Sequence, residues 1–316
     1  VGKDGIHAEN KDDTTLGFVY IMGGTLQIAA DDDGLHADQQ MFITGGQINI
    51  TKSYEGIEGT IVDISGGEIT VVSEDDGLNA AGGNDQSGFS GFGGGGFKGG
   101  GPGMGGESGD SSSYYICISG GRLNVNASGD GLDSNGALYV SGGEIYVSGP
   151  TNSGNGALDY DSEAAVTGGI LAAAGASGMA QNFGSTSTQG SMLVSTGTQT
   201  GGTAITLTDS SGKTLLSWAP EKAFECVVIS CPDIIQGETY TVSAGDFSTE
   251  IVMSSLIYGN GGMDGGPGGM RGGPGGMKGG PGEMKGDPGE MKGAPGERGD
   301  RKDFPGGTGG DFPNGL

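Results

Sequence analysis

The sequence predicts an all-β protein that contains a right-handed parallel β-helix, a solenoid with coils of about 22 residues. Two landmarks carry this prediction: a Gly-Gly pair between two apolar strands, and an acidic or amide residue followed by glycine. The landmarks keep nearly the same offset in every copy, as expected of a repeat architecture. The pairs begin at Gly23, Gly45, Gly66, Gly120, Gly142 and Gly168; the second landmark lies at Asp33-Gly34, Glu55-Gly56, Asp76-Gly77, Asp130-Gly131 and Asn155-Gly156.

Within each copy the apolar residues alternate with a period of two, which indicates strands rather than helices. In the first copy, Val19 and Ile21 precede the glycine pair, Leu26 and Ile28 follow it, and a third short strand begins at Leu35. Three short strands and three bends describe one coil with an aliphatic interior. The glycine pair permits the first corner, where a positive φ is expected.

Composition agrees with a solenoid, because 74 of the 316 residues are glycine and only 6% are aromatic. Such a chain cannot build a globular core of Leu and Phe, but it can stack narrow coils filled with Val, Ile, Leu and Ala. We predict three regions. They are a β-helix over 1–181 with a glycine-rich loop inserted at 82–113, a β cap over 182–258 that covers the solenoid's open end, and a low-complexity tail over 259–316.

The tail repeats a heptad, Pro-Gly-x-Met-Lys-Gly-x, from Pro267 to Pro295. It resembles collagen, but the Gly-x-y period breaks between Gly289 and Gly293, and a triple helix needs glycine at every third position. Two interpretations stay open: a disordered spacer, and extended polyproline-II segments that pack between chains.

Charge limits the partners. Residues 1–258 hold 31 acidic and 7 basic residues, whereas the tail holds 8 and 7. This excludes nucleic acid, which needs a basic surface, and favours cations or ligands held through cations. No segment is long and apolar enough to span a membrane and no signal peptide is present, so we expect Val1 to begin the distal part of a longer or processed product.

The three cysteines do not form a disulfide framework. Cys226 and Cys231 lie five residues apart, so a bridge between them would need an intervening turn. Cys117 occupies an outward repeat position and is expected to be a free thiol.

The acidic landmark predicts a calcium site. Successive coils lie about 4.8 Å apart, so acids at this landmark form one column, and stacked like charges require a counter-ion. Calcium takes carboxylate oxygens and can bridge two acids one coil apart. The alternative is a solvated acidic edge that resists lateral aggregation. The candidate ligands are Asp33, Glu55, Asp76 and Asp130, with Asp32 and Asp75 at the same corner.

Two further sets of side chains recur between coils. His7 and His36 each follow an Asp-Gly step, and with Asp38 they could hold a transition metal or simply form a surface ladder. Aromatic residues on a flat outward face could stack on sugar rings, although they also suit strands. These candidates for carbohydrate binding are Tyr20, Phe42 and Tyr139 in one column, and Tyr146 in the next with Gln27, Asn49, Thr70 and Asn124.

Catalysis has little support in the sequence. Solenoid lyases combine acid-bound calcium with a basic residue, and hydrolases use paired carboxylates. Arg122 is the only arginine before residue 259, and acid pairs such as Asp32-Asp33 are too common here to be informative. We therefore predict that the protein is not an enzyme.

The strings from Val19 to Leu26, from Ile64 to Ile69, from Asp76 to Ala80 and from Asn155 to Tyr160 resemble a family of secreted bacterial, often clostridial, proteins described as carbohydrate-binding domain proteins. The stretch from Gln189 to Val194, with Gly237 to Tyr240, resembles that family's C-terminal cap, so the resemblance covers roughly residues 3–258. This chain differs in lacking the family's N-terminal coils and in adding the tail.

The resemblance implies a right-handed parallel β-helix that binds calcium through Asp33, Glu55, Asp76 and Asp130. It also implies affinity for plant cell-wall polymers such as cellulose and polygalacturonate, without lyase activity. We therefore predict a calcium-dependent, non-catalytic carbohydrate-binding protein, secreted or at the cell surface. The alternative is a structural extracellular protein that self-associates into homo-oligomers or filaments.

Overall fold

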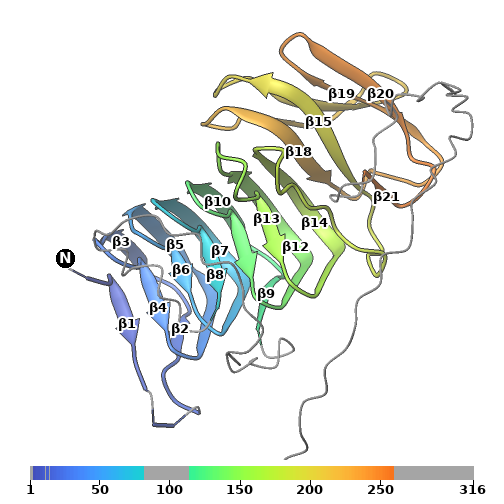
Figure 1. Ribbon diagram of the computed structural model, residues 1–316. Helices are drawn as coiled ribbons and strands as arrows, with labels where there is room; N and C mark the ends of the chain where they lie inside the picture. The colour runs from blue at the N-terminus through green and yellow to red at the C-terminus, as the bar shows by residue number, and fades with distance from the viewer. Residues whose placement is uncertain (1–2, 11, 14, 82–113, 260–316) are drawn as a thin grey trace, which may run out of the picture. The chain divides into compact units, whose positions relative to one another are not determined.

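The computed structural model describes the main body of the chain and shows only strands there, so the predicted all-β class is confirmed (Figure 1). No helix in the described part is long and apolar enough to cross a membrane. The predicted glycine-rich loop, and the predicted tail apart from Gly259, lie outside the described residues. The described residues are 3–10, 12–13, 15–81 and 114–259.

One sheet collects the short strand that follows the acidic landmark in each repeat. Its six strands pair in parallel with their neighbours one repeat away, so Leu35 lies beside Ile57 and Leu132 beside Leu158. In spatial order the strands are β1 (Ile6–Ala8), β4 (Leu35–Ala37), β6 (Ile57–Glu58), β8 (Leu78–Ala80), β11 (Leu132–Ser134) and β13 (Leu158–Tyr160).

A second sheet of eleven strands collects the strands on both sides of the Gly-Gly pairs. Its repeat strands also pair in parallel, with Ile43 beside Ile64 and Ile64 beside Ile118, and Figure 1 shows them in sequence order from blue to green. These strands are β2 (Val19–Ile21), β3 (Thr25–Ala29), β5 (Gln40–Lys52), β7 (Ile61–Ser73), β9 (Tyr115–Ile118), β10 (Arg122–Ala127), β12 (Ala137–Ser148) and β14 (Glu163–Gly175).

The Gly-Gly pairs stack on one another, and the two glycines of a pair have different roles. The second has a positive φ, for example 100° at Gly67 and 83° at Gly121, and residues other than glycine rarely adopt such a φ. From Gly45 onward the first glycine leaves no room for a Cβ atom, which at Gly66 would lie 2.4 Å from the carbonyl oxygen of Thr44 in the preceding repeat.

We predicted two separate strands around each glycine pair. This is confirmed at Gly23-Gly24, between β2 and β3, and at Gly120-Gly121, between β9 and β10. At the other pairs the glycines bend the strand without ending it, because β5, β7, β12 and β14 each run through the pair as one strand of 12 or 13 residues. The register shifts at this point in the pairing of β5 with β7 and of β12 with β14. A local bulge therefore absorbs the bend, and the pairing resumes beyond it.

The alternating apolar residues form the core predicted from the sequence. Ile64, Ile118 and Val140 stack one repeat apart and are almost fully buried. β-branched side chains pack well on a pleated surface, so a narrow interior can be filled without large aromatic residues.

Beyond β14 the pairing becomes antiparallel. β18 (Phe224–Ser230) pairs with β14 and with β15 (Ser191–Gln199), and β21 (Ile257–Tyr258) pairs in parallel with β15. Cys226 and Cys231 are buried and free, so no bridge joins them. A separate antiparallel sheet has the order β17 (Thr214–Trp218), β16 (Ile205–Asp209), β19 (Thr239–Ala244) and β20 (Phe247–Val252). The boundary between a β-helix and a cap at 181 and 182 stays a prediction.

Candidate functional site

The acidic landmark residues stack one repeat apart. The amide groups of Gly34, Gly56 and Gly77 each donate a hydrogen bond of 2.9 Å to the carbonyl oxygen of the landmark acid in the next repeat. These acceptors are Glu55, Asp76 and Asp130. Each glycine is also required sterically, since a Cβ atom at Gly56 would lie 2.2 Å from the carbonyl oxygen of Gly77.

The landmark predicted at Asn155-Gly156 is wrong by one residue. The amide of Gly131 donates to the carbonyl oxygen of Gly156 at 3.0 Å, and Leu132 lies beside Leu158, so Gly156 takes the position of the acid. The sequence misleads here because two glycines lie close together, at Gly154 and Gly156. The column of landmark acids therefore ends at Asp130.

Three carboxylates meet at this end of the column. Asp76, Asp130 and Asp133 each offer one oxygen atom, and these atoms lie within 4.8 Å of one another. Backbone groups hold two of them: the amide of Asp130 donates to Oδ1 of Asp76 at 2.7 Å, and the amide of Gly156 donates to Oδ1 of Asp130 at 2.5 Å. These hydrogen bonds hold two of three carboxylates whose oxygen atoms are close enough to contact one cation.

The charges in this cluster oppose one another. Burial raises the pKa of Asp76 to about 8, and repulsion from Asp133, Asp75 and Asp130 adds to the shift. Burial likewise raises the pKa of Asp130 to about 6, against the hydrogen bond from Gly156. A bound cation would favour the ionised forms of both acids.

Asp75 lies beside this cluster. An ideal Cβ atom on Gly129 would be 2.3 Å from Oδ1 of Asp75 and 2.3 Å from Oδ1 of Asp76, so both carboxylates occupy space that only glycine leaves open. Among the described residues, however, the groups of three close donors do not include Asp75.

The other predicted calcium ligands, Asp32, Asp33 and Glu55, lie in two different surroundings. Asp32 and Asp33 form a group of close oxygen atoms with Asp4, which the sequence analysis did not identify as a ligand. The buried carboxylate of Glu55 accepts a 2.8 Å hydrogen bond from Nδ2 of Asn79, and it belongs to no group of three close donors in the described part of the chain. The predicted column therefore divides into sites of different chemistry.

A second column lies three residues beyond the landmark, and the sequence indicated part of it. The parallel register places His7, His36, Glu58 and Asn79 beside one another in turn, followed by Asp133 and Asp159. Asn79 and Asp159 were not predicted as site residues. The signal for Asn79 was available, because Asn79 stands two residues after Gly77, the second position of a landmark. Asp159 has this spacing only from the corrected landmark, so the sequence alone did not indicate it.

His36 joins the two columns in the first repeats. Its Nδ1 atom lies 2.8 Å from Oδ2 of Asp33 and 2.5 Å from Oε2 of Glu58, and its Nε2 atom lies 3.3 Å from Oδ1 of Asp38. Burial opposes the charge on the ring, but the hydrogen bonds to Asp33 and Glu58 outweigh it and raise the pKa of His36 to about 11. Burial also raises the pKa of Asp33, to about 7, so the proton between these side chains is shared among them.

The predicted aromatic column is interrupted. Tyr20 and Phe42 lie edge to face with ring centroids 6.0 Å apart, but Asp63 and Cys117 take the next two positions before Tyr139. Tyr20 is half exposed and Tyr139 is 37% exposed.

Tyr146 has its own partners. Its ring packs against Trp218, with centroids 5.7 Å apart, and the guanidinium carbon of Arg122 lies 5.4 Å from its centroid. Arg122 also pairs with Glu144 at 3.1 Å.

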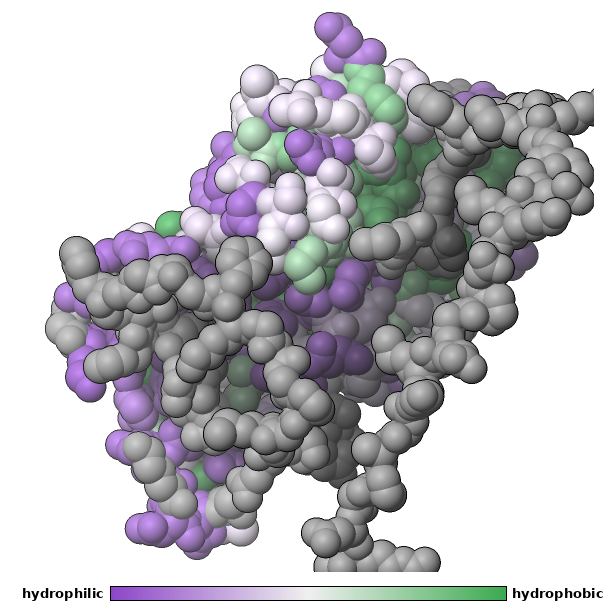
Figure 2. Space-filling view, in the orientation of Figure 1, coloured by the Kyte–Doolittle hydropathy of each residue, from purple (hydrophilic) through white to green (hydrophobic). Residues whose placement is uncertain are grey.

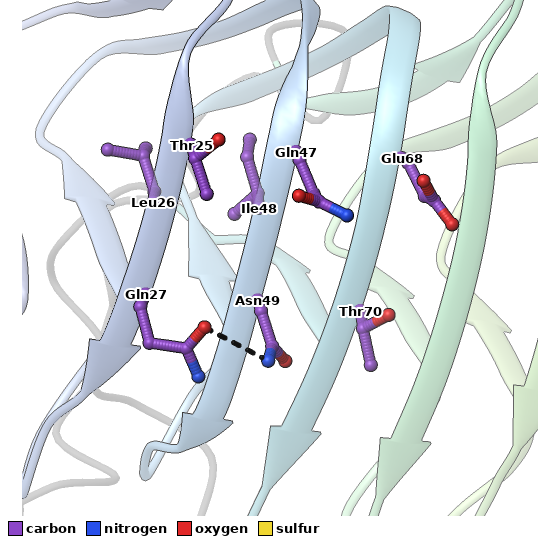
Figure 3. Close-up of a pocket in the computed structure, with 8 residues that line it drawn as sticks. All are labelled: Thr25, Leu26, Gln27, Gln47, Ile48, Asn49, Glu68 and Thr70. Carbon is purple, nitrogen blue, oxygen red and sulfur yellow. Dashed lines mark hydrogen bonds between the residues drawn. The ribbon is translucent and has the colours of Figure 1, made fainter.

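A groove of about 320 Å³ lies over β3, β5 and β7. Figure 3 shows two rows of polar side chains across these strands, and Nδ2 of Asn49 donates to Oε1 of Gln27 at 3.3 Å. Hydroxyl groups of a sugar are suitable partners for such amides and carboxylates. One row consists of Thr25, Gln47 and Glu68, and the other of Gln27, Asn49 and Thr70.

On the face shown in Figure 2, hydrophilic side chains predominate at the end that carries the first repeats. This polar surface agrees with the excess of acidic residues in the sequence.

Residues 1–99 match a family described as carbohydrate-binding domain-containing protein, which is less than a third of the 316-residue chain. No curated protein and no solved structure matches the chain. The matched segment contains β1 to β8 and therefore all the strands that line the groove.

Proposed function

We propose that this protein binds polysaccharide at the cell surface or outside the cell and does not catalyse a reaction. The polar groove over β3, β5 and β7 carries the proposal, because it lies within the segment that matches the carbohydrate-binding family. Gln27, Gln47, Asn49 and Glu68 offer hydrogen-bond donors and acceptors at the spacing of the strands. Tyr20 on β2 and Phe42 on β5, each ahead of a glycine pair in the sequence, add exposed or half-buried aromatic surface.

We further propose that the two sets of parallel strands wind as a right-handed parallel β-helix. Each repeat supplies strands to both sheets, and each strand pairs with its counterpart one repeat away. Such a winding would give a long polymer a flat face with regularly spaced polar groups. A crystal structure of the full chain with left-handed or non-helical winding would contradict this part of the proposal.

Calcium is part of the proposed function. Asp76, Asp130 and Asp133 offer a set of oxygen ligands only, as calcium prefers, and the ion would leave positions for the carboxylates of a uronate polymer. Polygalacturonate and cellulose are therefore the polymers to compare, since only the first carries carboxylates.

The test is a binding assay on insoluble polygalacturonate and cellulose with calcium and with chelator. If the wild type binds one or both polymers, substituting both Gln47 and Asn49 by alanine should reduce that binding, because the groove loses two amide side chains. Substituting Asp130 by Asn should reduce only the calcium-dependent part. Ser248→Ala, an exposed change on β20, serves as the matched control. Binding that is equal in all variants would refute the groove as the site.

A second function has one observation in its favour. Leu16, Phe18, Tyr20 and Met22 are 45%, 53%, 52% and 70% exposed, and they alternate along β2 and the residues on either side of it. In the described part of the chain, β2 is the terminal strand of the eleven-stranded sheet. An apolar stripe on a terminal strand favours self-association. Electron microscopy of the purified protein distinguishes the two functions, since filaments that disappear in Phe18→Asp would favour self-assembly.

A further inference from the structure

The first two repeats contain the same four-residue pattern, in which aspartate, glycine and an apolar residue precede histidine. It occurs as Asp4 to His7 and as Asp33 to His36. In both copies the aspartate carboxylate contacts the Nδ1 atom of the histidine three residues later, at 2.8 Å in the second copy. The same local geometry is therefore built twice.

The parallel pairing of β1 with β4 brings the two histidines together. His7 lies directly beside His36, and their ring centroids are 4.4 Å apart with an angle of 35° between the rings. In each ring the Nδ1 atom is engaged by a carboxylate, so Nε2 is the nitrogen that remains for another ligand.

Asp38 completes the group. Its Oδ2 atom accepts a 2.7 Å hydrogen bond from the amide of Asn10, which fixes the carboxylate, and its Oδ1 atom lies 3.3 Å from Nε2 of His36. One ligand atom from each of His7, His36 and Asp38 lies within 4.8 Å of the others. Two imidazoles and a carboxylate are a common ligand set for divalent transition metals.

We propose that His7, His36 and Asp38 bind a divalent transition metal ion of the zinc class. Asp4, Asp33 and Glu58 would act as positioning residues, because metal-binding histidines almost always donate their other N–H group to a carboxylate or carbonyl. Three protein ligands leave a fourth tetrahedral position for water or for an outside ligand.

This site differs in chemistry from the cluster of Asp76, Asp130 and Asp133. Calcium takes oxygen ligands, whereas imidazole nitrogen favours zinc, copper or nickel. An ion at the histidines would bring positive charge to four carboxylates that contact the two rings, those of Asp4, Asp33, Asp38 and Glu58.

The chain has only two histidines, so the imidazole signals in ¹H–¹⁵N NMR of the full-length protein report this site alone. On titration with zinc chloride we expect the Nε2 resonances of both rings to shift and to saturate at one ion per chain, while both Nδ1–H groups persist. Cobalt(II) should show the absorption of a four-coordinate site. Thiol binding at the cysteines would not produce the imidazole signal.

The variants separate ligands from positioning residues. His7→Gln and Asp38→Asn should abolish stoichiometric binding, whereas Asp4→Asn should weaken it roughly 10–100-fold. Asp63→Asn, on the outward face of β7, is the control and should bind as the wild type does. His7 is partly exposed, so its substitution leaves the fold testable even where a change at the buried His36 does not.

Unchanged histidine resonances at one equivalent of zinc would overturn the proposal, as would undiminished zinc binding in His7→Gln. Loss of the site in Asp63→Asn as well would show that the effect is not specific to these ligands. None of these outcomes depends on polysaccharide binding.

Discussion

Replacing Asp76 with asparagine should change stability in opposite directions with and without calcium. Burial and neighbouring acids raise the pKa of Asp76 from 3.8 to about 8. Because the folded-state pKa is above the unfolded one, the contribution of this group to stability is complete below about pH 4 and is lost as pH rises through about 8. At pH 7 the loss is at most about 4 kcal/mol, from roughly three units at 1.36 kcal/mol each.

Asparagine keeps the oxygen that accepts the amide of Asp130 but carries no charge. Asp76 is partly exposed, so we expect about half of the limiting value. In chelator at pH 7, Asp76→Asn should therefore be more stable than the wild type by about 2 kcal/mol, or roughly 4–8 °C in melting temperature. Between pH 5 and 8 the stability of the wild type should fall more steeply than that of the variant.

Calcium should reverse this order. An ion that binds only the folded state at a hundredfold excess over its dissociation constant stabilises it by about 2.7 kcal/mol. The wild type should gain this stability, whereas the variant, with one carboxylate removed from the cluster, should gain much less.

The assay is calorimetric or spectroscopic melting of both proteins in calcium and in chelator, at pH 5, 7 and 8. Asp31→Asn is the control, since Asp31 forms an exposed pair with Lys52 and exposed pairs contribute little to stability. An equal calcium response in both proteins would refute the ion at this cluster. A variant less stable than the wild type in chelator at pH 7 would refute the electrostatic reasoning.

Three further predictions concern the fold, each checked by denaturant or thermal unfolding. Gly121→Ala should be more destabilising than Gly197→Ala, because both glycines have positive φ but only at Gly121 would the Cβ atom meet backbone, at 2.7 Å; similar losses would contradict this. Ile64→Ala should cost about 2–5 kcal/mol and the exposed Ile235→Ala less than about 0.5 kcal/mol, and a small loss at Ile64 would argue against the stacked core. Burial lowers the pKa of Lys222 from 10.5 to about 8. Between these two pH values Lys222 is neutral in the folded state but protonated in the unfolded state, so the free energy of unfolding should rise from pH 8 to 10.5. Lys222→Met should remove that rise.

The stacking of the repeats could be predicted because the sequence repeats the same residue types at the same positions in each copy. Each apolar position has a counterpart one period away, and parallel pairing brings these counterparts together, as at Ile43 and Ile64. The glycine pairs were predicted as corners between separate strands. Two of the pairs do separate strands, but at the other four the structure keeps one bent strand, because a positive φ at a glycine such as Gly67 turns the chain while the flanking residues continue their pairing.

The site was predicted only in part. A column of landmark acids follows from the register alone, so the stacking of Glu55 on Asp76 could be expected. Which side chains meet depends on the bend after each landmark, and the bend brings residues three apart into contact. His36 therefore contacts Asp33. The carboxylate of Glu55 instead accepts a hydrogen bond from Asn79, and in the described residues it belongs to no group of three close metal-ligand atoms.

In the two columns, the landmark column and the column three residues beyond it, the backbone pairing sets where side chains lie, and the residue types set what they can bind. The stack fixes the distance between a landmark residue and its neighbour three positions on, and the residue types at these two positions change from repeat to repeat. At the first repeats they are aspartate and histidine, which suits a nitrogen-binding metal. In the middle the landmark carboxylate of Glu55 meets the amide of Asn79, which lies three positions after the landmark of the next repeat, and this pair hydrogen-bonds without an added ion.

At the far end only carboxylates meet, at Asp76, Asp130 and Asp133, which suits calcium. The order of these three arrangements follows from single-residue differences at equivalent positions, since the backbone pairing is the same throughout. A repeat protein can therefore place cation sites of different selectivity along one edge, because each site depends on local residue types and the distance between sites is set by the number of repeats.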